Sequence, residues 1–101
     1  MREIIDVPNG KQLLMENLTP GERFDLLSAV GSNWNSAPYI FMAEAVCSVR
    51  EIGGVAISLP ASASELKARA NELGDEGVNA ATQWLQKHNN YNLPDKEAAK
   101  N

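Results

Sequence analysis

The sequence has few of the residues on which enzymes and metal proteins rely. It contains one cysteine, Cys47, and one histidine, His88, among 101 residues. A lone cysteine excludes an internal disulfide, and the apolar neighbours of Cys47 favour a buried structural thiol. His88 lies near the C-terminus of an expected helix, where the helix dipole favours a cation. We therefore predict no metal site, no cofactor and no catalytic activity. The sequence alone leaves a catalytic Cys47–His88 pair as an alternative.

The chain also lacks runs of positive charge and long apolar runs. Nine Lys and Arg stand against thirteen Asp and Glu, which gives a net charge of -4. This balance opposes non-specific binding to nucleic acid or to anionic lipid. The longest apolar run, residues 37–43, is too short to span a bilayer, and residues 1–6 do not resemble a signal peptide. We expect a soluble cytoplasmic protein with no nucleic-acid partner and no membrane partner.

The first two expected helices differ in how much of their surface is apolar. A capping box formed by Thr19 and Glu22 predicts a helix over about 20–30. Its buried face is expected to carry Phe24, Leu27 and Val30. The second helix, from about 37 to 50, is apolar nearly all round and is therefore expected to be central, covered by the domain or by a partner. Its narrow polar stripe, expected to face solvent, consists of Glu44, Ser48 and Glu51.

Two glycines interrupt the chain after the second helix. Gly53 and Gly54 lie between residues 49–52 and residues 55–59. Residues 55–59 alternate between apolar and small side chains, as a strand does. Two consecutive glycines tolerate the positive φ angles of a tight hairpin turn. A phosphate-binding loop would need a helix directly after the glycines and more glycines, which the sequence does not have. We therefore predict a short β-hairpin over 49–59.

The C-terminal half is expected to form two helices and a tail. A second capping box, Ser62 to Glu65, begins the third helix, and Gly74 ends it. Asp75 begins the fourth. The fold class predicted is mainly α: a small four-helix domain over residues 1–89 with one short β-hairpin, followed by a flexible, disordered tail over 90–101. A second hairpin, turning at residues 8–10, is a further expectation.

Large apolar side chains are numerous for a small domain. Trp34 lies among polar residues in a loop, which is typical of a side chain that contacts a partner. The candidate partner-binding residues are Trp34, Tyr39, Phe41, Met42 and Trp84. An alternative is that the last two helices form a helix-turn-helix that reads DNA. Its reader helix would present Asn79, Thr82, Gln83, Gln86 and Lys87, although the same helices carry many acidic side chains.

Several short motifs resemble those of the tail assembly chaperones of long-tailed bacteriophages. They are the run VREIGGV at 49–55, the capped start ASEL at 63–66, the junction ELGDEG at 72–77 and the helix entry LTPGER at 18–23. The resemblance covers residues 15–88. It implies a non-catalytic protein of the host cytoplasm that binds the tape measure protein and helps to recruit tail tube subunits, with a homo-oligomer as a further possibility. Another phage adaptor module, such as a head–tail adaptor, is the alternative beside the DNA-binding regulator.

Overall fold

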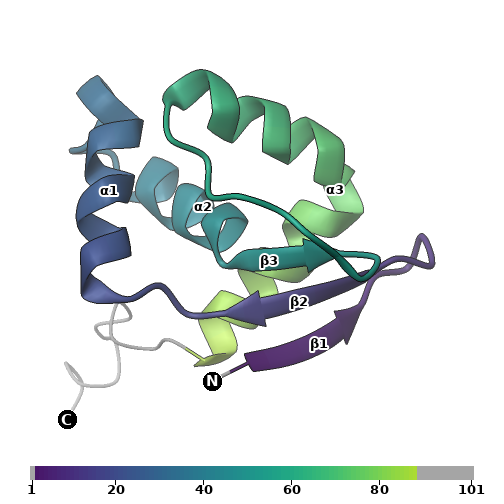
Figure 1. Cartoon of the computed structure of the whole chain (residues 1–101). Coiled ribbons are helices and arrows are strands. Elements are labelled where there is room, and N and C mark those ends of the chain that lie inside the picture. The colour runs from purple at the N-terminus through teal and green to yellow at the C-terminus, as the bar shows by residue number, and fades with distance from the viewer. Residues whose placement is uncertain (1, 89–101) are drawn as a thin grey trace, which may run out of the picture.

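The strands form one antiparallel sheet in the computed structural model, which describes residues 2–88. Its strands, in spatial order, are β1 (Arg2–Asp6), β2 (Gln12–Glu16), β3 (Val49–Ile52) and β4 (Val55–Ala56). The first three are labelled in Figure 1. Both expected hairpins are therefore present. They are parts of a single sheet because β2 also pairs with β3, with Leu13 opposite Ile52.

The turn of the second hairpin agrees with its sequence. Gly53 and Gly54 have φ angles of 60° and 84°, a conformation that other residues adopt only with strain. The prediction that these glycines form a hairpin turn is thus confirmed. The second strand is shorter than expected, because β4 ends at Ala56 and residues 57–59 continue without strand pairing.

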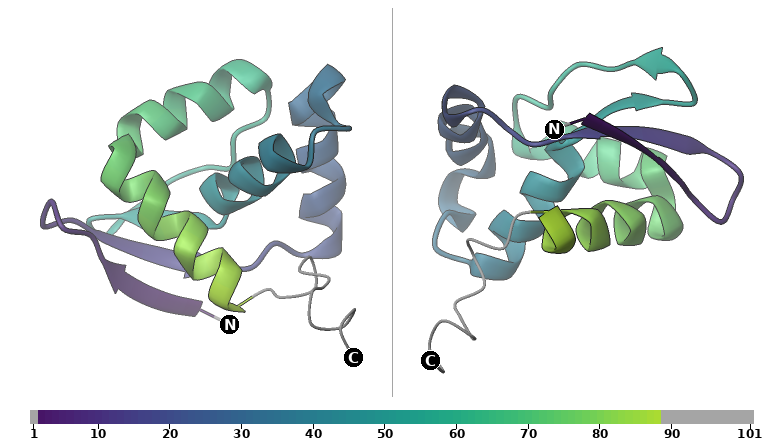
Figure 2. Two further views of the ribbon diagram at one scale, coloured as in Figure 1. Left: turned by 180° about the vertical axis from the view of Figure 1, so that it is seen from behind. Right: turned by 90° about the horizontal axis from the view of Figure 1, so that it is seen from below.

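Three α-helices accompany the sheet in the described part of the chain. They are α1 (Pro20–Val30), α2 (Ala37–Cys47) and α3 (Ala63–His88), with a short 3-10 turn, η1 (Gly31–Asn33), after α1. α2 and α3 pack against each other and cover one face of the sheet, while α1 lies beside α2 (Figure 2). None of these helices is long and apolar enough to cross a bilayer.

The predicted fold of four helices and one hairpin is therefore wrong, and the domain is α/β. The expected third and fourth helices are the two halves of α3, which is kinked at Gly74 with φ 74° and ψ 175°. That backbone conformation is essentially restricted to glycine, so the break in the helix is set by this residue. A Cβ on Gly77 would lie 3.0 Å from the Cβ of Leu73, so a second glycine lets the two halves meet closely. The predicted tail, 90–101, lies outside the described residues.

The buried face of α1 differs from the predicted one. Val30 is buried as expected, but Phe24 is 73% exposed and Leu27 is 47% exposed. The buried side chains are Leu26, Ala29 and Val30. Glu22 in the first turn is bonded to Arg50 of β3, and positions four, seven and eight residues after Glu22 share its helical face. Because that contact sets the rotation of α1, the Phe24–Leu27 stripe faces solvent.

The polar stripe of α2 is also not solvated as predicted. Glu44 and Ser48 are both buried, and only Glu51 of the three is partly exposed. The Glu44 carboxylate pairs with the guanidinium of Arg23 on α1 at 3.2 Å. The Ser48 hydroxyl donates a hydrogen bond to the Glu44 carbonyl oxygen at 2.8 Å. α1 thus covers a face of α2 that sequence reasoning assigned to water, because a buried carboxylate is tolerated when a cation pairs with it.

Candidate partner-binding site

An apolar groove lies between α2 and the first half of α3. It has a volume of about 360 Å³ and is open to solvent. The lining residues are Ser36, Pro38, Tyr39, Met42, Ala43 and Val46 from α2 and its N-cap, and Leu66, Lys67 and Ala70 from α3. We call this feature the α2–α3 groove. Concave apolar surfaces with few polar groups are the usual sites at which proteins bind ligands or partner side chains.

The spacing of the lining residues explains why the groove exists. Tyr39, Met42, Ala43 and Val46 recur at i, i+3, i+4 and i+7, so they form one stripe along α2. Leu66 and Ala70 are four residues apart on α3 and face that stripe. Ala43 and Ala70 have small side chains, so two packed helices leave space between them where larger residues would fill it. A stripe shared by two helices is a surface on which a third helix can pack.

The groove has a defined end at the start of α2. The Ser36 hydroxyl caps the helix by accepting a hydrogen bond from the backbone N–H of Tyr39 at 3.4 Å. Pro38 stands in the first turn, where its missing N–H costs no helical hydrogen bond. Lys67 is the charged residue of the lining and is exposed. The apolar floor therefore has one cation at its rim.

The five candidate partner-binding residues are in different surroundings. Tyr39 and Met42 line the groove, and Met42 is 50% exposed. Phe41 is half-buried and packs against the core. Trp34 is exposed beyond η1 and is not part of the groove lining, whereas Trp84 is buried under the sheet.

Sequence reasoning did not identify the rest of the groove. Ala43 and Val46 could have been found from the i, i+3, i+4, i+7 stripe that they form with Tyr39 and Met42. Leu66 and Ala70 could not, because only the packing of α3 beside α2 places them opposite that stripe.

A smaller cavity of about 240 Å³ lies beside Cys47, between α1 and the segment before α3. It is lined by Leu18, Glu22, Asp25, Leu26, Ser28, Cys47, Leu59, Pro60 and Ala61. Burial raises the pKa of the Cys47 thiol to about 11, so the thiol is protonated at neutral pH. This agrees with the prediction of a buried structural cysteine, since a reactive cysteine needs its thiolate form.

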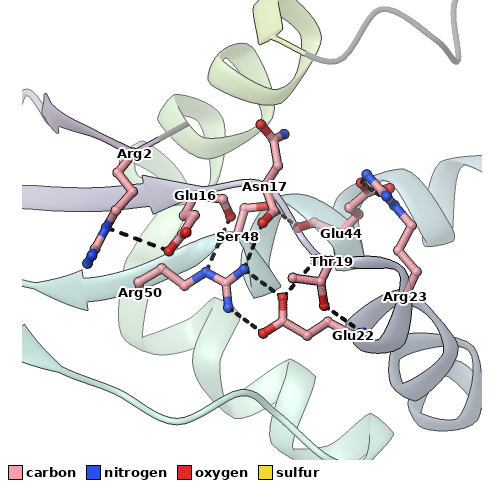
Figure 3. A network of polar contacts seen from close by, with 9 residues as sticks. All are labelled: Arg2, Glu16, Asn17, Thr19, Glu22, Arg23, Glu44, Ser48 and Arg50. Atoms are coloured by element: carbon pink, nitrogen blue, oxygen red, sulfur yellow. Dashed lines mark hydrogen bonds and ion pairs between the residues drawn. The ribbon is translucent and has the colours of Figure 1, made fainter.

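A polar network centred on Arg50 joins β3 to the start of α1 (Figure 3). The Arg50 guanidinium donates to both carboxylate oxygens of Glu22, at 2.9 and 3.1 Å, and to the carbonyl oxygens of Glu16 and Asn17. Glu22 also completes the predicted capping box, accepting from the backbone N–H of Thr19 at 2.9 Å. The hydrogen bond from Arg50 and that from Thr19 lower the pKa of Glu22 to about 2.

Because the pKa of Glu22 is lowered on folding, the free energy of unfolding depends on pH in the acid range. Its folded pKa lies below the unfolded value, so its stabilisation is complete above that unfolded value and is lost as pH falls toward about 2. Between about pH 6 and about pH 3 the free energy of unfolding should fall by about 1–2 kcal/mol more in the wild type than in Glu22→Gln, allowing for partial exposure of the carboxylate. Urea unfolding at both pH values measures this difference. Equal losses in the two proteins would contradict the assigned role of Glu22.

A third cluster joins the C-terminal end of α3 to β1. The indole Nε1 of Trp84 donates to a carboxylate oxygen of Glu3 at 2.9 Å, and Nε2 of His88 lies 3.3 Å from the same oxygen. Nδ1 of His88 is 3.0 Å from the carbonyl oxygen of Trp84, and the two rings stack. His88 therefore contacts the last turn of the helix, as its sequence position suggested. The indole N–H of Trp84 is hydrogen-bonded within the domain.

The residues of the DNA-reading alternative lie on the second half of α3. Asn79, Gln83, Gln86 and Lys87 are exposed, and the hydroxyl of the half-buried Thr82 donates to the carbonyl oxygen of Asn79. Gly77, Ala81 and Leu85 of the same half-helix are buried against the domain. Within residues 2–88, no three His, Cys, Asp or Glu side chains gather in a way that could hold a metal ion.

Comparison of the chain with protein-family models, with curated proteins and with solved structures gives no match.

Proposed function

We propose that this protein is a non-catalytic tail assembly chaperone of a long-tailed bacteriophage. In this proposal it works in the host cytoplasm, binds the tape measure protein through the α2–α3 groove, and helps to recruit tail tube subunits. The observation that carries the proposal is the groove, an open apolar surface between two helices. The motif resemblance over residues 15–88 supplies the class of partner.

The chemistry of the groove suits a long helical partner. Tyr39, Met42 and Val46 offer about two helical turns of apolar surface, about 10 Å in length. A helix that presents large apolar side chains at i, i+3 or i+4 and i+7 could insert them over Ala43 and Ala70. Such a helix aggregates when its stripe is exposed to water. A small acidic protein that covers the stripe would keep the complex soluble, since net charge opposes association.

Co-expression with a tape measure fragment tests the proposal. The fragment should come from the tape measure protein of a long-tailed bacteriophage, and it should be expressed alone and together with this protein. We expect the fragment to be insoluble alone and to be soluble and co-purified when both are made. A fragment that stays insoluble and does not co-purify would contradict the proposal.

The same preparation separates the alternatives. A gel shift with duplex DNA at physiological salt is expected to show no complex, because the second half of α3 begins with the exposed acidic residues Asp75 and Glu76. A salt-sensitive DNA complex together with no fragment binding would instead favour the DNA-binding regulator. Binding to head–tail connector subunits rather than to the fragment would favour the adaptor.

A further inference from the structure

β1 forms an open edge of the sheet. Within residues 2–88 it pairs only with β2, and β2 is its neighbour on one side alone. The backbone N–H and C=O groups on the other side of β1 therefore have no strand partner in this part of the chain. An exposed edge of this kind is a template on which another strand can add.

The side chains of β1 alternate between the two faces of the sheet. Glu3 points to the helices, as its bond to Trp84 shows, and Ile5 packs against the core. Successive side chains of a strand point to opposite faces, so Arg2, Ile4 and Asp6 are on the face away from the helices. Ile4, at the centre of the strand, is 62% exposed.

We propose that β1 pairs with β1 of a second copy of this chain, antiparallel and centred on Ile4. In that register Ile4 of each copy stands opposite Ile4 of the other, and Arg2 stands opposite Asp6 of the second copy on the same face. The two-fold symmetry repeats the Arg2–Asp6 pair, so one strand supplies both halves of a complementary interface. Opposite charges and apolar pairs directly across two strands stabilise their pairing.

The existing contacts of these side chains permit this arrangement. Arg2 pairs with Glu16 at 3.6 Å, with side chains that are 60% and 40% exposed, and Gln12 donates to Asp6 at 3.0 Å. Such surface contacts are weak and leave further donor and acceptor positions on each group. The two copies form one continuous eight-stranded sheet with both helix layers on the same side. The α2–α3 groove contains no residue of β1, so it stays open.

A cysteine trap tests the register directly. Ile4→Cys places two thiols across the symmetry axis, at a separation within reach of a disulfide, whereas Val55→Cys places a thiol at a comparably exposed site, 66% against 62%, on the opposite edge of the sheet. With oxidised glutathione as oxidant, Ile4→Cys should form the covalent dimer about tenfold faster or more, because pairing raises the local thiol concentration. Equal rates for the two variants would overturn the proposal.

Charge exchange provides a second test that does not depend on a new thiol. Sedimentation should show a concentration-dependent dimer of the wild type. Asp6→Lys places two cations opposite each other and should weaken that dimer about tenfold. Adding Arg2→Glu to the same chain should restore it. Asp25→Lys makes an equal charge change on α1, outside the sheet, and should leave dimerisation as in the wild type. A wild type that stays monomeric at all concentrations would contradict self-pairing, as would a double variant that does not regain dimerisation. Either result would instead favour pairing of β1 with a strand of another protein.

Discussion

Replacing Arg50 with methionine is expected to lower the free energy of unfolding by about 3 kcal/mol. The Arg50 side chain is 17% exposed, and its guanidinium donates to both carboxylate oxygens of Glu22 and to two backbone carbonyl oxygens. Methionine fills a similar volume but donates nothing, so four acceptors lose a charged donor, and two of them are the oxygens of the partly buried Glu22 carboxylate. For a domain of this size, such a loss is a large share of the total stability.

Urea unfolding at neutral pH measures the effect. Lys87→Met is the matched control, because it removes one positive charge at an exposed position in the last turn of α3 and should change stability by less than about 1 kcal/mol. If Arg50→Met were no more destabilised than Lys87→Met, the Arg50 network would not be what joins α1 to the sheet.

Blocking the α2–α3 groove is expected to weaken binding of the tape measure fragment by at least about tenfold. Met42→Glu puts a charge at the centre of the apolar stripe, and Ala70→Trp fills the space between the helices. Each should weaken binding by about tenfold to a hundredfold, the cost of placing an unpaired charge or a steric block in an apolar contact. Because Met42 and Ala70 are not fully buried, both variants should keep the helical circular dichroism of the wild type.

The control is Val55→Glu, which introduces the same charge at an exposed apolar residue of β4, away from the groove. It should bind the fragment as the wild type does. Binding that survives both groove variants, or that falls equally in the control, would show that the partner does not use this surface.

Local sequence signals predicted the starts, ends and turns of most elements. The capping box at Thr19, the cap at Ser62, the two-glycine turn and the break at Gly74 are all present. Each depends on side chains or φ angles within a few residues of one another. Such signals can therefore be read from the sequence without knowledge of the tertiary fold.

The signals failed where distant contacts decide the outcome. β2 joins β3 across more than thirty residues of intervening chain, which local periodicity does not reveal, so two separate hairpins were not recognised as one sheet. The ion pair between Glu22 and Arg50 sets the rotation of α1. The ion pair with Arg23 of another helix allows Glu44 to be buried. Only tertiary packing brings these pairs together.

The motif that suggested a phage chaperone is structural. In the run from Val49 to Gly54, Val49 is buried, Arg50 holds α1, and the glycines make the hairpin turn. A motif of this kind specifies a scaffold, whereas binding depends on a site placed on that scaffold. The groove is therefore the part of the molecule on which the functional proposal has to be tested.

The most direct test is a titration of the isotopically labelled protein with the tape measure fragment, followed by amide chemical shifts. We predict that the largest changes fall on the groove residues of α2 and α3, from Tyr39 to Val46 and from Leu66 to Ala70, with little change on the outer face of the sheet. A fragment that causes no shifts, or shifts confined to residues outside the groove, would contradict the claim that this groove receives a partner helix.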